Sequence, residues 1–197
     1  LPIKTKRVTN HFLARAQTKP FIIAFLLHIF TQFNLMTSPQ IPHLDSNQQQ
    51  FRAFLDGKVI TLKKLDDGVF SEGVLGEGLA IIPDNDELIA PCDGRVSLVI
   101  PDSRHAIGLT LYNGVEIMLH IGLDTVNMKG DGFKYFVENG QKVKQGDKLI
   151  KFDKDKIKKA GYVDTTICVI TNPNGKTMEF HTGIVAKANE TNLIEFK

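Results

Sequence analysis

The stretch that decides the fold is residues 106–123, AIGLTLYNGVEIMLHIGL. Two runs rich in Ile, Leu and Val flank the Asn-Gly pair at 113–114, and this arrangement is a strong signal for a β-hairpin with a two-residue turn. Side chains alternate along a strand, so Ile117 and Leu119 share one apolar face while His120 lies on the other. The segment therefore predicts two antiparallel strands of a sheet.

The chain beyond residue 50 has the same character. Short Val- and Ile-rich runs are separated by turn signals such as DDG, PDND, ENG and NPNG, a spacing typical of a sandwich or barrel. DKDKIKKAG at 153–161 has a helical pattern, with Asp153 as N-cap and Gly161 as stop. FKYFVEN at 133–139 is a second candidate for a short helical turn. We therefore predict an all-β fold, a compact β-sandwich or barrel-like domain with one or two short helices.

A weak internal repeat supports this fold class. LDGKVITL at 55–62 and CDGRVSLV at 92–99 share the pattern x-Asp-Gly-basic-Val, so Gly57 and Gly94 would each lead the chain into a strand. ENGQKVKQGDKLIKF at 138–152 reads as a related hairpin. The repeat predicts one sheet motif that is used more than once.

Glycine marks the domain boundary. All 16 glycines lie at or beyond Gly57, and TSPQIPHLDSNQQQ at 37–50 reads as a polar linker that contains Pro and Gln. We place an N-terminal extension at 1–35, a linker at 36–50 and the folded domain at 51–197.

The extension is basic and partly apolar. It contains five Lys or Arg and no acid, and PFIIAFLLHIF at 20–30 is too short to cross a membrane, because a span needs about 20 apolar residues. Three interpretations are open: translation starts at Met36, so that the extension is not part of the native protein; the segment lies on a membrane surface; or it is a secretory signal.

Charge and cysteine usage limit the function classes. The remainder of the chain holds 19 basic and 22 acidic residues, and a mildly acidic domain gives no support for nucleic-acid binding. Cys92 and Cys168 form no CxxC pair and lie in apolar runs, so we expect reduced structural thiols in a cytoplasmic protein.

Two of the six histidines, His105 and His120, lie on or next to the predicted hairpin. Alternation alone places His105 at the polar end of an apolar face, as a histidine of the core. With the turn centred between residues 113 and 114, however, His105 faces residue 122, so the two imidazoles are diagonal neighbours within reach of each other. Ser103 and Asp124 lie close to them in sequence.

Three chemistries fit this group of residues. A neutral imidazole presents a lone pair at physiological pH and can attack a phosphoryl group, with the second histidine and Ser103 supporting the oxygens. Two histidines and a carboxylate could instead hold zinc, although no HExxH motif supplies a third ligand. The third reading is a β domain that only binds partners.

From about Phe51 to Lys197 the sequence resembles the glucose-type enzyme IIA component (EIIA) of the bacterial phosphoenolpyruvate-dependent sugar phosphotransferase system. The resemblance covers about three quarters of the chain, and LHIGLDTV with the upstream HAIG is its most specific part. It implies a β-sandwich of the duplicated hybrid motif type. The matching segments are GEGLAIIP, IAPCDGRV, SRHAIGL, GVEIMLHIGLDTVNMKGDGF and GQKVKQGDKLIKFD.

The resemblance also implies roles for individual residues. His120 matches the histidine that accepts the phosphoryl group on Nε2 from the phosphocarrier HPr and passes it to a cysteine of a IIB domain. His105 matches the second histidine, which stabilises the phosphoryl group. Ser103 stands where the family usually has threonine, so the hydroxyl is kept, and Asp124 is expected to neighbour the site without reacting.

The implied protein is a histidine phosphocarrier, a phosphotransferase component of sugar transport that works in the cytoplasm or peripherally at the inner membrane face. Its expected partners are HPr, the IIB domain of a IIBC sugar permease and regulatory proteins, without nucleic acid. No cofactor is expected, and zinc at His105 and His120 would be adventitious or induced by a partner. Two alternatives stay open: a regulatory IIA-like protein without phosphate relay, and a zinc metallopeptidase of related fold.

Overall fold

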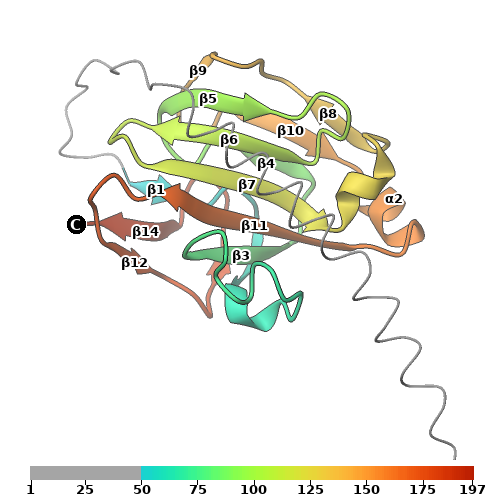
Figure 1. Cartoon of the computed structure of the whole chain (residues 1–197), viewed down its shortest axis with the longest axis horizontal. Helices are drawn as coiled ribbons and strands as arrows, with labels where there is room; N and C mark the ends of the chain where they lie inside the picture. Colours follow the sequence, from blue (N-terminus) through green and yellow to red (C-terminus); the bar gives the residue numbers. More distant parts are fainter. Residues whose placement is uncertain (1–49) are drawn as a thin grey trace, which may run out of the picture. The chain divides into compact units, whose positions relative to one another are not determined.

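A computed structural model describes residues 50–197 (Figure 1). The proposed extension and all but the last residue of the proposed linker lie outside this range. No helix among residues 50–197 is long and apolar enough to cross a membrane.

The described part of the chain consists almost entirely of short strands. Its one α-helix is α2, Lys154–Lys159, and two 3-10 turns, η1 at Leu62–Lys64 and η2 at Thr125–Met128, complete the helical content of residues 50–197. The strands in chain order are β1 Phe51–Arg52, β2 Gly57–Thr61, β3 Gly78–Pro83, β4 Glu87–Ile89, β5 Gly94–Val99, β6 Ala106–Leu111, β7 Glu116–Leu123, β8 Phe133–Tyr135, β9 Lys142–Val143, β10 Lys148–Phe152, β11 Val163–Asn172, β12 Met178–Phe180, β13 Val185–Ala186 and β14 Asn192–Phe196.

One large antiparallel sheet dominates the fold. Its order is β13-β2-β3-β11-β7-β6-β5-β9, and two smaller sheets have the orders β1-β14-β12 and β4-β10-β8. The large sheet is symmetric about its central β11–β7 pair, with the β2-β3 pair on one side and the β5-β6 pair on the other. Figure 1 shows β3, β11, β7, β6 and β5 in this order. The predicted all-β class is confirmed, and the symmetric order agrees with a sheet motif used twice.

The repeated glycines have a common physical role. Gly57 opens β2 and Gly94 opens β5. A Cβ on Gly57 would lie 2.1 Å from the carbonyl oxygen of Ile82, and one on Gly94 would lie 2.6 Å from that of Thr110. Each glycine is therefore required because a neighbouring strand passes too close for any side chain.

The core lies between the large sheet and the two smaller ones. Ile117, Leu119 and Ile121 of β7 belong to it, together with buried residues of β10 and β14, so the domain is a sandwich in which both layers contribute apolar side chains. Cys92 and Cys168 are free and buried in this core, and burial raises the pKa of both thiols. They are placed as structural thiols.

The turn between β6 and β7 differs from the prediction. Gly114 has φ +81°, but Asn113 does not have positive φ, whereas the predicted two-residue type I′ turn needs positive φ at both positions. The Asn113 side chain instead accepts a hydrogen bond from Val115 N at 3.1 Å, and Leu111 N donates to Val115 O at 2.8 Å. The loop is thus three residues long, which shifts the register by one and pairs Ala106 with His120.

The helix prediction is confirmed at one place and wrong at another. Asp153 caps α2 by accepting a hydrogen bond from Lys156 N at 2.9 Å, and Gly161 follows the helix with φ +83°. Residues 133–139, by contrast, contain strand β8, which pairs with β10. The tertiary pairing overrides the weak local helical pattern.

The predicted hairpin at 138–152 is also wrong. β9 pairs with β5, whereas β10 pairs with β4 and β8. The turn between β9 and β10 therefore carries the chain from the large sheet to a smaller one.

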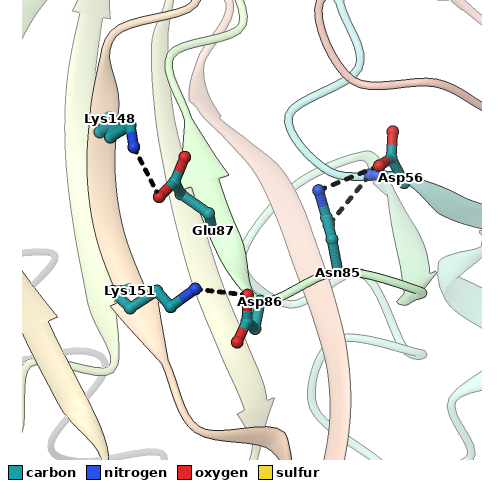
Figure 2. A network of polar contacts seen from close by, with 6 residues as sticks. All are labelled: Asp56, Asn85, Asp86, Glu87, Lys148 and Lys151. Carbon is teal, nitrogen blue, oxygen red and sulfur yellow. Dashed lines mark hydrogen bonds and ion pairs between the residues drawn. The ribbon is translucent and has the colours of Figure 1, made fainter.

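Polar contacts join β10 to the first residue of β4 and to the segment just before it (Figure 2). The two ion pairs among them are largely exposed, so water and salt screen them and they contribute little to stability. The contacts are Lys148 Nζ–Glu87 Oε2 at 2.9 Å, Lys151 Nζ–Asp86 Oδ1 at 2.7 Å, and Asn85 Nδ2–Asp56 Oδ2 at 3.2 Å.

Candidate functional site: a histidine pair on the central sheet

His120 lies near the end of the central strand β7. Its backbone pairs with Ala106 of β6 on one side and with Ile167 of β11 on the other. Leu119 and Ile121 point into the core, so the alternation of the strand sends the His120 ring to the opposite face of the sheet. Its position is held by hydrogen-bonded strands on both sides.

His105 reaches His120 by a route that alternation does not give. It lies in a bend just before β6, after Arg104, whose φ is +52°. Its carbonyl accepts a hydrogen bond from Ile121 N at 2.8 Å, and in a regular ladder that register would send the two histidines to opposite faces. The bend takes His105 out of the alternation, and the two rings meet edge to face at 89°, with centroids 4.6 Å apart.

One hydrogen bond fixes the protonation of His120. Its Nδ1 lies 2.9 Å from the carbonyl oxygen of Gly122, and since a carbonyl only accepts, the ring must donate from Nδ1. In the neutral imidazole the Nε2 lone pair is then free. Gly122 presents its carbonyl with φ +75°, and a Cβ there would lie 2.4 Å from Thr125 Cγ2, so the position requires glycine.

His105 has a partner of a different kind. Its Nδ1 lies 2.8 Å from the hydroxyl oxygen of Ser103, and both residues are buried. A hydroxyl can donate or accept, so this contact allows His105 to carry its proton on Nε2. The two histidines are therefore equipped for opposite roles at Nε2, one as lone pair and one as N–H donor.

Burial keeps both imidazoles neutral. It lowers the pKa of His120 to about 4, against the opposing effects of the Gly122 hydrogen bond and the Asp67 charge. Burial, and then the nearby His120, lower the pKa of His105 well below its normal value. Two uncharged rings at neutral pH leave the His120 lone pair available as a nucleophile.

A loop before β3 contributes two residues that the sequence did not indicate. Phe70 packs against the His120 ring, with centroids 5.1 Å apart. Asp67 accepts hydrogen bonds from the backbone N–H of Phe70 at 3.1 Å and of Ser71 at 2.9 Å. Burial raises the pKa of Asp67, but its hydrogen bonds outweigh that effect and lower it, so the carboxylate is charged and fixed. An Asp followed by small and apolar residues, as in DDGVFS, is a signal for such a capped turn.

Asp124 is placed differently from the other predicted site residues. It is exposed, has φ +60° and precedes η2, where its carbonyl accepts from Asn127 N at 3.1 Å. Its carboxylate makes no hydrogen bond or ion pair with another residue in the range 50–197. The charge that acts on His120 comes from Asp67.

A metal would find few ligands here. Within residues 50–197, no group of three His, Cys, Asp or Glu side chains could hold a metal ion. His105 and His120 could supply two nitrogens to a zinc ion, and a further ligand would have to come from outside residues 50–197.

Comparison with known proteins places the chain in a family. Residues 49–175 match the family described as "phosphoenolpyruvate-dependent sugar phosphotransferase system, EIIA 1". Among solved structures, glucose permease IIA from Mycoplasma capricolum is similar at 39% sequence identity and a TM-score of 0.68, over 77% of this chain and 99% of that one. Both histidines lie within the matched range. The chain belongs to the EIIA type 1 family of the sugar phosphotransferase system, whose members carry phosphoryl groups during sugar uptake and generally work with HPr and a IIB domain.

Proposed function

We propose that Nε2 of His120 accepts a phosphoryl group from phosphorylated HPr and passes it to the cysteine of a IIB domain, in the cytoplasm beside a sugar permease. The observation that carries this proposal is the hydrogen bond from His120 Nδ1 to the carbonyl of Gly122, 2.9 Å long. It leaves one nitrogen, Nε2, with a lone pair for nucleophilic attack.

In the first step the Nε2 lone pair attacks phosphorus. A P–N bond forms, and the bond between phosphorus and its former carrier breaks, with its electron pair leaving on the carrier. Nδ1 keeps its proton throughout, so the ring becomes cationic as it is phosphorylated. The Gly122 carbonyl and the Asp67 charge favour the cationic ring, since both raise the pKa of His120.

In the second step a thiolate of the IIB domain attacks the same phosphorus. A P–S bond forms, the P–N bond breaks, and its electron pair returns to Nε2. Phosphoryl transfer depends on positioning and on stabilising charge on the oxygens. His105 can stabilise this charge when Ser103 donates to its Nδ1, because His105 Nε2–H can then donate to a phosphoryl oxygen.

The test is incubation with phosphoenolpyruvate, enzyme I and HPr, followed by intact mass spectrometry. The expected product carries one acid-labile phosphoryl group, which is absent from His120→Ala. His181→Ala is the matched control, because His181 follows β12 of a smaller sheet and its ring contacts Glu195, and it should be modified like wild type. An unmodified wild type, or modification that persists in His120→Ala, contradicts the relay; binding of HPr without modification would favour a regulatory role.

The two histidines can be separated by a second variant. His105→Gln keeps the His120–Gly122 hydrogen bond, so we expect His120 to accept the phosphoryl group but to pass it on slowly. Normal onward transfer to a IIB domain by this variant would remove the proposed role of His105.

A further inference from the structure

A single hydroxyl group holds both ends of the loop that carries Ser103 and His105. Tyr135 Oη accepts a hydrogen bond from Ile100 N at 3.0 Å, at the start of the loop. It donates to the carbonyl oxygen of Ala106, directly after His105. The two ends of the loop between β5 and β6 are thus closed on one side-chain atom.

The hydroxyl comes from the other layer of the sandwich. Tyr135 is the last residue of β8, where it pairs with Ile150 of β10, and its ring packs against the core. Burial raises the pKa of Tyr135 to about 12, so the hydroxyl keeps its proton and stays a donor to Ala106 at any pH at which the protein works. The anchor is therefore fixed to the core rather than to the loop.

Inside the loop, the contacts that shape the turn are local. Arg104 N donates to Ile100 O at 2.9 Å, and Arg104 Nε donates to Pro101 O at 3.1 Å. These bonds make a compact turn, with Arg104 in the left-handed region, but they do not tie it to the second layer. Outside the turn, Ile121 N donates to the carbonyl oxygen of His105 at 2.8 Å, and the Tyr135 hydroxyl bonds to both ends of the loop. The direction of the His105 ring therefore depends on these contacts.

We propose that Tyr135 is a positioning residue of the phosphoryl-transfer site, which holds the 100–106 loop so that the His105 ring meets His120. This inference rests on the proposed function only for its kinetic consequence. Tyr135→Phe keeps the ring in the core and removes both hydrogen bonds. His120 keeps its own bond to Gly122 in that variant, so the effect is confined to His105.

The kinetic experiment separates the two steps. In Tyr135→Phe, acceptance by His120 from phosphorylated HPr stays within about twofold of wild type, while transfer to the IIB domain slows about tenfold, the loss expected for hydrogen bonds of ordinary strength. The double variant Tyr135→Phe/His105→Gln is no slower than His105→Gln alone, because both changes remove the same contribution. Tyr162→Phe is the control: this tyrosine also packs against the core, but its hydroxyl makes no hydrogen bond with another residue of the described range.

A second measurement needs no phosphoryl transfer. In ¹⁵N NMR spectra of the imidazoles, Tyr135→Phe should move the His105 resonances and leave Nδ1–H of His120 in place, while Tyr162→Phe changes neither. Unchanged His105 resonances, wild-type onward transfer, equal slowing of both steps or additive loss in the double variant would each overturn the inference. Failure of the wild type to be phosphorylated would refute the proposed function instead, and the NMR result would still decide whether Tyr135 holds the loop.

Discussion

Replacing His120 with glutamine should make the domain less sensitive to acid. Burial lowers the pKa of His120 to about 4 in the folded protein, whereas in the unfolded chain the imidazole has its normal pKa of about 6.5. Between these two values the unfolded state binds more protons than the folded state. Stability is therefore lost as the pH falls below the unfolded value, and the loss is complete once the folded imidazole also protonates.

The size of the effect follows from the two pKa values. At 1.36 kcal/mol for each pH unit, the full loss from His120 is about 3 kcal/mol, of which about 2 kcal/mol has occurred by pH 5 and almost none at pH 7.5. His105 acts in the same direction, since burial and the neighbouring His120 lower its pKa as well. The pKa of Asp67 is lowered from its normal value of 3.8, so Asp67 changes stability only as the pH falls below about that value. It has no effect between pH 7.5 and 5.

The assay is urea unfolding at pH 7.5 and pH 5.0. From pH 7.5 to pH 5.0, the free energy of unfolding of wild type should fall by about 2 kcal/mol more than that of His120→Gln. The glutamine keeps a donor for the Gly122 carbonyl but does not titrate. Met118→Leu is the control for a change on the same face of β7, and it should keep the wild-type dependence on pH. Equal losses in wild type and His120→Gln would refute the depressed pKa and the neutral-nucleophile reasoning built on it.

Three further outcomes test the surroundings of the site. Gly122→Ala forces a Cβ to within 2.4 Å of Thr125 at φ +75° and should cost about 2–4 kcal/mol in urea unfolding while slowing phosphorylation; a stable, active variant would contradict the glycine requirement. Asp67→Ala should lower the free energy of unfolding by about 1–2 kcal/mol, and Asp67→Asn should lower it less, because asparagine keeps one acceptor. Both variants should lower the pKa of His120 in an NMR titration, because the Asp67 charge raises it. Phosphorylation of His120 should raise the pKa of His105, because an anion then lies beside it, and an unchanged titration curve would place the phosphoryl group elsewhere.

The sequence was sufficient for those features of the fold that depend on local pattern. Alternation along 115–121 placed Ile117 and Leu119 in the core and His120 on the opposite face, and Asp153 was correctly read as a helix cap. It failed where tertiary contacts decide, as in β8, whose local pattern is helical but which completes a sheet with β10. Asp67 and Phe70 were missed for the same reason, because nothing in DDGVFS indicates that this turn folds over a strand fifty residues later.

The histidine pair shows how a correct proximity can follow from an incorrect register. The predicted two-residue turn placed His105 opposite residue 122, on the same face as His120, whereas the actual three-residue loop places it opposite Ile121. By alternation alone, that shift separates the rings. They meet because Arg104 takes the left-handed conformation just before β6, in a loop whose two ends bond to Tyr135. An arginine carries no signal for that conformation, which L residues other than glycine, asparagine and aspartate seldom adopt. The reactive geometry thus depends on an unusual backbone conformation at Arg104, in a loop held by a residue of another sheet. For this reason the family resemblance could indicate the histidine pair, whereas strand alternation by itself could not.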